Sequence, residues 1–147
     1  MSDALTPLGP ADPRQLGTYR LLGTLGAGGM GTVYLGRSGR RLAAVKTLRP
    51  ELARDAHLLA RFQNEIRAAS AVRHHGVAAV LDSDMAAVPP WFAGEFVAGP
   101  TLAECVANHG PLAEHAVRGL ASARSDCPCV TFARAFSSWA SAIWRSA

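Results

Sequence analysis

Lysine is almost absent from this sequence of 147 residues, which uses arginine fourteen times and lysine once, at Lys46. An ammonium is compact and strongly hydrated, whereas a guanidinium is a planar fork, so the two are not interchangeable at a specific site. Codon bias alone would explain the preference for arginine. The exception makes Lys46 the first candidate for a specific role.

The sequence also lacks a secretory signal, a long apolar run and a tract of basic residues. Residues 1–17 contain no apolar signal segment, and no apolar run approaches the about 20 residues of a membrane-spanning helix. The three cysteines form no pattern of pairs, which favours a reducing compartment. We therefore expect a cytoplasmic location, no membrane contact and, because the net charge of +4 is scattered, no nucleic-acid partner.

Charged residues are few as well, at 18% against 49% hydrophobic residues. A chain of this composition folds rather than remaining disordered, but its length allows only one small core. Three prolines within residues 1–17 predict a flexible leader, because proline cannot donate a hydrogen bond to a helix or a sheet. Order is expected to begin near Tyr19.

The segments after the leader predict a meander of strands followed by a helix. Residues with high β-propensity gather at 19–25, 32–35 and 41–48. After Pro50 the apolar residues recur every three or four positions, which predicts a helix with Asp55 as its N-cap and an end at 74–76. Two more strands are expected, at 77–82 and 91–97. The predicted fold is α+β, a five-stranded antiparallel sheet with one main helix.

A glycine-rich segment, Gly26–Val33, contains the pattern G-x-G-x-x-G-x-V. A dinucleotide-binding loop would run into a helix, and a P-loop would carry Gly-Lys-Ser/Thr, whereas Gly31 is followed by residues that favour a strand. The segment is therefore expected at the tip of a hairpin, where glycine lets backbone N–H groups approach phosphate oxygens. The alternative is a hairpin softened by glycine, without a ligand.

Lys46 ends the segment Ala43–Lys46, which matches the V-A-I-K pattern of a strand whose lysine reaches the α- and β-phosphates of a nucleotide. Glu65 falls on the packed face of the predicted helix, where a carboxylate needs a partner. Lys46 is the expected partner. Arg61, one turn earlier on the same helix, is the alternative.

With these motifs in this order, the chain from Tyr19 to about Arg118 resembles the N-terminal lobe of a bacterial eukaryotic-like serine/threonine protein kinase. The resemblance implies an N-lobe and hinge at 18–99, the beginning of C-lobe helices at 100–119, and ATP as ligand. It implies Glu65 as the salt-bridge partner of the lysine. The implied nucleotide-binding residues are Leu25, Gly26, Ala27, Gly28, Gly29, Gly31, Val33, Ala44, Lys46, Glu95 and Val97.

Within this set the resemblance implies separate roles. Val33 and Ala44 would cover the adenine, and Glu95 and Val97 would offer hinge backbone groups to its edge. Gly94 would stand at the gatekeeper position, where the family usually has a bulkier residue. A glycine there would open the pocket behind the adenine and weaken its packing.

The residues that transfer phosphate in this family are missing. They come from H-R-D-x-x-x-x-N and D-F-G, and neither motif occurs in these 147 residues. The nearest imitation, His115–Arg118, lacks the acid. Magnesium is expected in the family, but its ligands are absent here. We therefore expect no catalytic residue, no metal site and no activity of the isolated chain.

Residues 120–147 differ in composition, with six of the ten serines and two of the three tryptophans. This atypical tail suggests a truncated kinase with a reading frame shifted near residue 119, which is a hypothesis. An amphipathic helix through Phe132 and Trp139 that docks on a membrane or partner is an alternative. Cys127 and Cys129 fall short of a four-ligand metal site.

Two functions remain open at this point. The first is the ATP-binding lobe of a protein serine/threonine kinase, which binds ATP weakly and meets protein substrates only if a C-lobe is supplied. The second is a non-catalytic, pseudokinase-like interaction module that regulates a partner. A lobe that has lost its partner lobe exposes apolar surface and is marginally stable, so a cooperative thermal melt would favour the module.

Overall fold

The computed structural model describes residues 5–71, 78–98, 106–108, 110–111 and 114. The chain divides into two compact units, and the first, which includes Asp3–Val72 and Ala79–Phe96, contains all the strands and the long helix. We call this unit the lobe. The predicted helix end at 74–76, most of the segment 100–119 and the whole of 120–147 lie outside the described residues.

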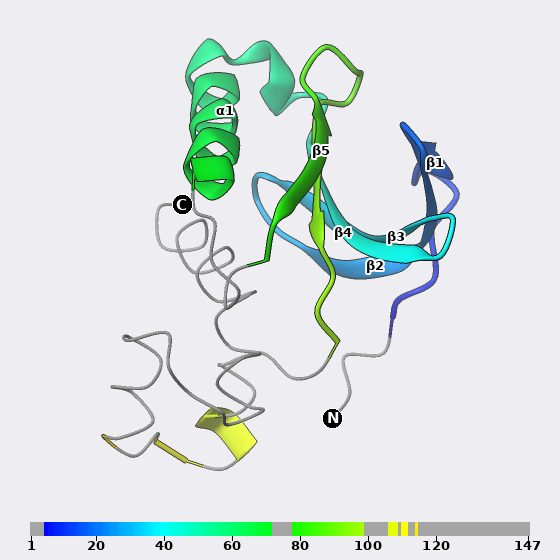
Figure 1. The fold of residues 1–147 in the computed structure, drawn as a ribbon. Helices are drawn as coiled ribbons and strands as arrows, with labels where there is room; N and C mark the ends of the chain where they lie inside the picture. Colours follow the sequence, from blue (N-terminus) through cyan, green and yellow to red (C-terminus); the bar gives the residue numbers. More distant parts are fainter. Residues whose placement is uncertain (1–4, 72–77, 99–105, 109, 112–113, 115–147) are drawn as a thin grey trace. The chain divides into compact units, whose positions relative to one another are not determined.

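The lobe is built on one sheet in the order β1-β2-β3-β4-β6-β5, with every neighbouring pair antiparallel (Figure 1). The strands are Gln15–Leu16 (β1), Tyr19–Ala27 (β2), Gly31–Ser38 (β3), Arg41–Leu48 (β4), Val80–Asp84 (β5) and Trp91–Glu95 (β6). Gly39 takes a φ of +59° in the turn between β3 and β4, a conformation that favours glycine. The predicted sheet is confirmed, with β1 as a short addition.

Strand β4 is buried on both faces. Every residue from Ala43 to Leu48 is buried, whereas no residue of the edge strand β5 is. Side chains alternate along a strand, so Ala43 and Val45 point to one layer and Ala44 and Lys46 to the other. Each face of β4 therefore needs its own cover.

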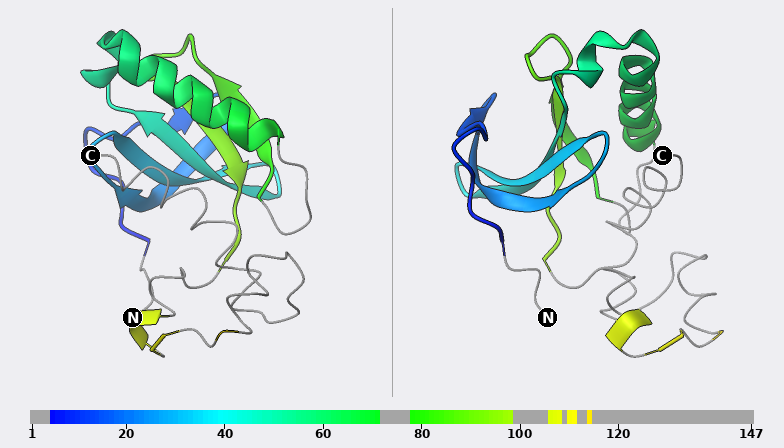
Figure 2. Two further views of the ribbon diagram at one scale, coloured as in Figure 1. Left: turned by 90° about the vertical axis from the view of Figure 1, so that its left-hand side faces the viewer. Right: turned by 180° about the vertical axis from the view of Figure 1, so that it is seen from behind.

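Helix α1 (Ala56–Ala71) covers one face of the sheet beside β5 (Figure 2), after a short 3-10 turn, η1 (Leu52–Arg54). Asp55 caps the helix as predicted, because its Oδ1 accepts hydrogen bonds from two backbone N–H groups of the first turn, at 2.8 and 3.2 Å. Phe62 is the buried residue of the helix. Its ring centroid lies 5.2 Å from that of Phe92 in β6, which fixes the helix on the sheet.

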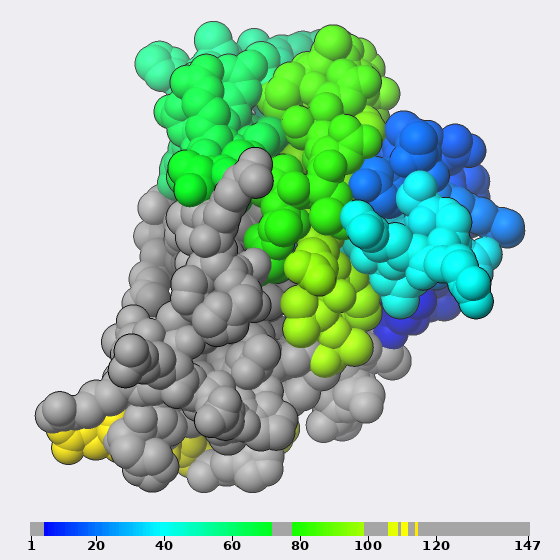
Figure 3. All heavy atoms as spheres, viewed as in Figure 1, coloured from blue at the N-terminus to red at the C-terminus, as the bar shows by residue number. Residues whose placement is uncertain are grey.

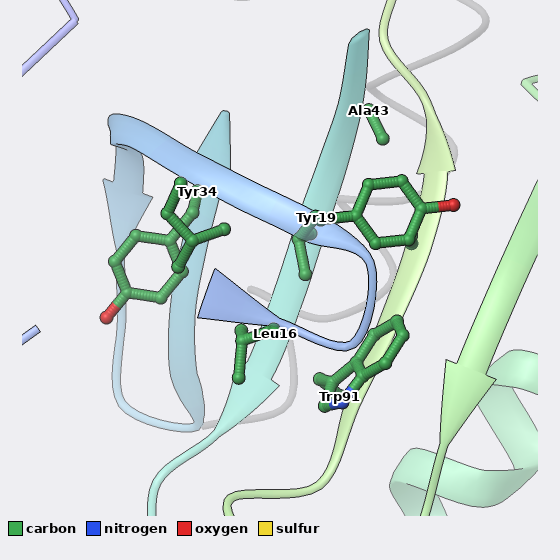
Figure 4. Close-up of a cluster of buried hydrophobic side chains, with 8 residues drawn as sticks. Leu16, Tyr19, Tyr34, Ala43 and Trp91 are labelled. Atoms are coloured by element: carbon green, nitrogen blue, oxygen red, sulfur yellow. The ribbon is translucent and has the colours of Figure 1, made fainter. Parts of the chain in front are cut away.

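The other face carries a cluster of buried apolar side chains (Figure 4). Tyr19 meets Trp91 edge to face, with ring centroids 5.9 Å apart. Gly36 leaves room for this packing, since a Cβ there would lie 2.8 Å from the side chain of Val45. The cluster consists of Leu16, Tyr19, Leu21, Tyr34, Ala43, Val45, Trp91 and Ala93.

The sequence predicts a flexible leader, but in the structure residues of this segment pair with the sheet. Residues 5–17, which we call the N-terminal strap, pair with β2. Thr6 and Thr24 exchange two backbone hydrogen bonds of 3.1 and 2.8 Å, and β1 pairs with the start of β2. Leu16 is buried in the apolar cluster and Leu8 packs against it. Prolines interrupt a continuous ladder, but the residues between them still pair at single points and cover the apolar face.

Tyr34 ties the strap to the sheet, because its Oη donates a hydrogen bond of 2.8 Å to Oδ1 of Asp12. Burial, followed by this hydrogen bond and the charge of Asp12, raises the pKa of Tyr34 to about 12. We expect Tyr34→Phe to lower the free energy of unfolding by about 1 kcal/mol at neutral pH. Urea unfolding of the full chain measures this loss.

The effect of Tyr34→Phe also depends on pH. The unfolded phenol has a pKa of 10.0 and the folded one a pKa of about 12, so the stabilisation is complete below pH 10 and is lost as the pH rises toward 12. Tyr19→Phe is the matched control, since no hydrogen bond of the Tyr19 hydroxyl is formed within the described residues. An equal loss in both variants at neutral pH would contradict the role of Asp12.

Candidate functional site

The glycine segment connects β2 and β3, as predicted. The loop closes on itself, because the N–H of Gly28 donates to the carbonyl oxygen of Gly31 at 2.9 Å. The N–H of Arg49 donates to the carbonyl oxygen of Met30 at 3.1 Å, which ties the loop to the end of β4. Figures 1 and 2 show the tip of this hairpin on the same side of β4 as helix α1.

The glycines of this loop have two different explanations. A Cβ at Gly31 would lie 1.8 Å from the carbonyl oxygen of Thr47, so close packing on β4 excludes a side chain there. A Cβ at Gly26 or Gly29 would meet no atom within 4 Å, and neither residue has a positive φ. Packing and backbone conformation in the lobe therefore do not require glycine at these two positions.

Lys46 lies toward the end of β4, opposite Val33 in β3 and Phe92 in β6. Residues directly opposite each other in antiparallel strands share a face, so these three side chains form a row across the sheet. Phe92 packs against Phe62 of α1. The row therefore lies on the face that the helix covers.

The lysine forms the ion pair expected from the sequence. Its Nζ lies 3.3 Å from Oε2 of Glu65, and the two side chains are 8% and 22% exposed. Glu65 and Arg61 are both described, and the alternative pair between them is not formed. A buried strand and the facing side of α1 are thus joined through opposite charges.

The ammonium of Lys46 is shielded from water, and it has more N–H donors than the described residues provide acceptors for. Burial lowers the pKa of Lys46, and the opposing charge and hydrogen bond of Glu65 do not cancel this effect. An ammonium has three N–H donors, and in the described part of the chain one acceptor, Glu65, is present. The ring centroid of Phe62 lies 5.9 Å from Nζ, at the outer limit of a cation–π contact. A further anionic acceptor would therefore be favourable here.

The sheet beside the lysine is lined by small or apolar side chains. Ala44 lies two residues before Lys46 and so on the same face, and it is opposite both Leu35 and Gly94. Ala44 and Gly94 are buried, whereas Val33 and Leu35 are half-buried. This arrangement provides a flat apolar surface next to a positive charge.

The remaining predicted site residues fall into two groups. The loop and strand residues lie consecutively on β2, the loop and β3: Leu25, Gly26, Ala27, Gly28, Gly29, Gly31 and Val33. Glu95 is exposed at the end of β6, and its N–H already donates to the carbonyl oxygen of Ala79 at 2.9 Å, so this donor is not free for a ligand. Val97 belongs to the second unit and is not part of the lobe.

Phe92 was not among the residues predicted for the site, although it lies directly opposite Lys46. All of Trp91–Gly94 is buried. A strand without alternating polarity does not show which of its residues face the helix. The opposition of Phe92 and Lys46 becomes visible only through the strand register.

Two kinds of feature are absent from the described residues. They contain no group of three histidine, cysteine, aspartate or glutamate side chains that could hold a metal ion. Within the same residues, no helix has the length and apolarity needed to cross a membrane.

The unequal burial of the ion pair predicts unequal effects of removing its two partners. Glu65→Gln leaves the more deeply buried ammonium without a charged partner, and we expect the free energy of unfolding to fall by about 1–3 kcal/mol. Lys46→Met removes the dehydrated ammonium and leaves a carboxylate that water reaches, so we expect a smaller loss or a gain. Urea unfolding of both variants measures the difference.

Arg61→Gln is the control for these variants, because Arg61 lies one turn from Glu65 and takes no part in the pair. We expect it to change stability by less than about 0.5 kcal/mol. A larger loss in Lys46→Met than in Glu65→Gln would be evidence against the asymmetry.

No protein-family model matches the chain. It is 50% identical over 113 residues to the serine/threonine-protein kinase AfsK of Streptomyces coelicolor, which covers 76% of this chain and 14% of the relative. Identity is 44% over 119 residues with the probable serine/threonine-protein kinase PkwA of Thermomonospora curvata, covering 80% and 16%. The chain thus spans less than a fifth of the length of these curated relatives.

Solved structures give the same result. The kinase domain of PknI from Mycobacterium tuberculosis is 28% identical, with a TM-score of 0.55 over 73% of this chain and 44% of that chain. A double mutant of the same domain has a TM-score of 0.56 over 78% and 47%. Over the residues that it shares with these proteins, the chain is homologous to bacterial serine/threonine protein kinases and has the fold of their N-terminal lobe.

Proposed function

We propose that the lobe binds ATP, with Lys46 as the residue that contacts the α- and β-phosphates. The observation that carries the proposal is the setting of the single lysine of the sequence. It is buried, paired with Glu65 and opposite Val33, two residues after the last glycine of the loop. Burying an ammonium opposes folding, so a phosphate ligand gives a reason for keeping it there.

The glycine loop supports the same ligand. Gly26 and Gly29 have open space where a Cβ would be, so the lobe alone would accept a side chain at either position. A phosphate group that approaches the backbone N–H groups of the loop would collide with a side chain at these positions, so its binding requires glycine there. The residues present therefore fit the phosphates of a nucleotide.

The apolar surface beside Lys46 suits the adenine. Val33 and Ala44 share the face of the lysine, and the buried Gly94 adds no side chain next to Ala44. We propose that these residues cover the base, with more room behind it than a bulkier residue at position 94 would leave. Glu95 can contribute its carbonyl group but not its N–H, which is bonded to Ala79.

We further propose that the polypeptide of these 147 residues does not transfer phosphate by itself. Phosphoryl transfer needs a carboxylate to orient the attacking hydroxyl and ligands for Mg²⁺. Neither H-R-D-x-x-x-x-N nor D-F-G occurs in the sequence, and the described residues offer no metal cluster. The described residues thus fit the nucleotide and offer no cluster of three metal ligands.

ATP binding is testable by NMR titration of the 147-residue chain, with the amides of the glycine loop as reporters. We expect a dissociation constant on the order of 0.1–1 mM, since the lobe supplies few contacts. Lys46→Met should weaken binding at least about tenfold, because a charge-assisted hydrogen bond is lost.

Two variants control the titration. Arg54→Met removes an exposed positive charge in η1 and should leave the affinity unchanged. Gly29→Val adds a side chain in open space, so it should keep the thermal stability and still weaken binding. Equal affinities of Lys46→Met and wild type would refute the assignment of Lys46, and low-micromolar binding by wild type would show a more complete site than proposed.

Phosphate transfer is testable separately, by incubating the chain with radiolabelled ATP, Mg²⁺ and a generic protein substrate. We expect the label on protein to stay at the level of Lys46→Met, because the orienting carboxylate is missing. Incorporation that exceeds this background and disappears in Lys46→Met would show that the 147 residues are active.

A further inference from the structure

Positive charge is concentrated in one part of the chain. The segment from Pro13 to Pro50 contains seven basic residues and no acidic one, although the net charge of the whole sequence is only +4. Strands β2, β3 and β4 all lie within this segment. Among the described residues, Lys46 is the one basic side chain of the segment with a carboxylate within 4 Å. The other positive charges there are not compensated by an ion pair.

The strand register gathers part of this charge on one face. Arg20 in β2 is opposite Arg37 in β3, and Arg37 is opposite Leu42 in β4, so the three side chains share a face. Leu22 follows Arg20 by two residues and is exposed as Arg20 is, at a β-bulge between Leu21 and Gly23 that leaves it without a partner in β3. We call these four residues the arginine–leucine row. Arg40, in the adjacent β3–β4 turn, is also exposed.

The row is unfavourable for a lobe in water. Like charges directly opposite each other in a sheet repel. Leu22 and Leu42 expose 37% and 38% of their surface next to these charges. A surface with negative charges and an apolar interior would neutralise the repulsion between the arginines and bury the exposed leucines.

The row lies on the same sheet face as Lys46, at the adenine end of the proposed nucleotide site, because Leu42 precedes Ala44 by two residues on β4. Arg37 lies four residues along β3 from Val33, and Leu42 lies four residues along β4 before Lys46. Four residues of a strand correspond to about 13 Å. None of the four residues of the row is among the proposed contacts to ATP, and the row lies farthest from the phosphate end of the site.

We propose that the arginine–leucine row docks on membranes rich in anionic lipids. Its guanidinium groups would bind lipid phosphates in bidentate fashion, and its leucines would enter the boundary between headgroups and acyl chains. Figure 3 shows the region around the β3–β4 turn, coloured cyan, projecting from the lobe rather than lining a hollow. A projecting and basic surface fits a bilayer better than a groove-bound peptide.

The charge of the row gives a reversible association. Each arginine near an anionic bilayer strengthens binding by about fivefold. Arg20, Arg37 and Arg40 together would contribute roughly a hundredfold, which salt would weaken. The row is therefore suited to recruitment that depends on the lipid composition.

The test is flotation of the 147-residue chain with vesicles of equal parts phosphatidylcholine and phosphatidylglycerol, and with vesicles of phosphatidylcholine alone. We expect binding to the anionic vesicles only, with release at high salt. The double variant Arg20→Gln/Arg37→Gln should bind roughly 25-fold more weakly. Leu22→Ser/Leu42→Ser should also bind more weakly, although its charge is unchanged.

The matched control is Arg54→Gln/Arg67→Gln, which removes two exposed arginines from η1 and α1. It has the same net charge as the other arginine variant and should keep most of the binding. Thermal melts should be similar for wild type and the arginine variants because the replaced arginines are exposed, whereas Leu22→Ser/Leu42→Ser should melt at a lower temperature because each leucine is more than half buried. If the arginine variant of the row does not fold, the leucine variant decides the question.

Several results would overturn the proposal. They are equal losses in the two arginine variants, equal binding to both kinds of vesicle, no binding by wild type, or binding that survives without the row. Binding of a phosphoserine peptide in place of vesicles would also overturn it and would assign the row to a phosphorylated protein partner.

Discussion

Strand β4 has to be covered on both faces, and most of the lobe follows from this requirement. Its alanines, Ala43 and Ala44, are small enough to let neighbouring elements come close. Helix α1 covers one face through Phe62, and the cluster around Tyr19 and Trp91 covers the other. A lobe of this size has little apolar area to spare, so the N-terminal strap, which adds Leu16 to the cluster, belongs to the fold.

The same buried strand carries a charge that opposes its burial. Lys46 has a lowered pKa because dehydration outweighs the attraction of Glu65. An apolar residue at this position would satisfy the packing of β4 against Phe62 and Phe92 without that conflict. A charged side chain kept where an apolar one would be more stable is typical of functional sites. Here the conflict is confined to one side chain, whose neighbours on the sheet are small or apolar.

The sequence was sufficient for features that depend on local pattern. Helical periodicity placed α1 and its Asp55 cap, and the position of Glu65 on the packed face led to its partner. The strap was missed, because three prolines within 17 residues suggest disorder and do not reveal pairing at isolated residues such as Thr6. The arginine–leucine row was missed for a different reason. Arg20 and Arg37 are far apart in sequence, and they become opposite only through a register that shifts twice between β2 and β3.

The two covers of β4 are linked through the glycine loop. On one side of the loop, Thr24 is held by two backbone hydrogen bonds to Thr6 of the strap. On the other side, Gly31 packs so closely on Thr47 that no side chain fits between them. Between these fixed points, Gly26 and Gly29 have open space around them. The strap therefore holds the base of the loop from the apolar face, while the segment next to Lys46 stays unobstructed. Fixed ends and an unobstructed tip suit a loop whose backbone N–H groups have to approach phosphate groups while its strands stay paired in the sheet.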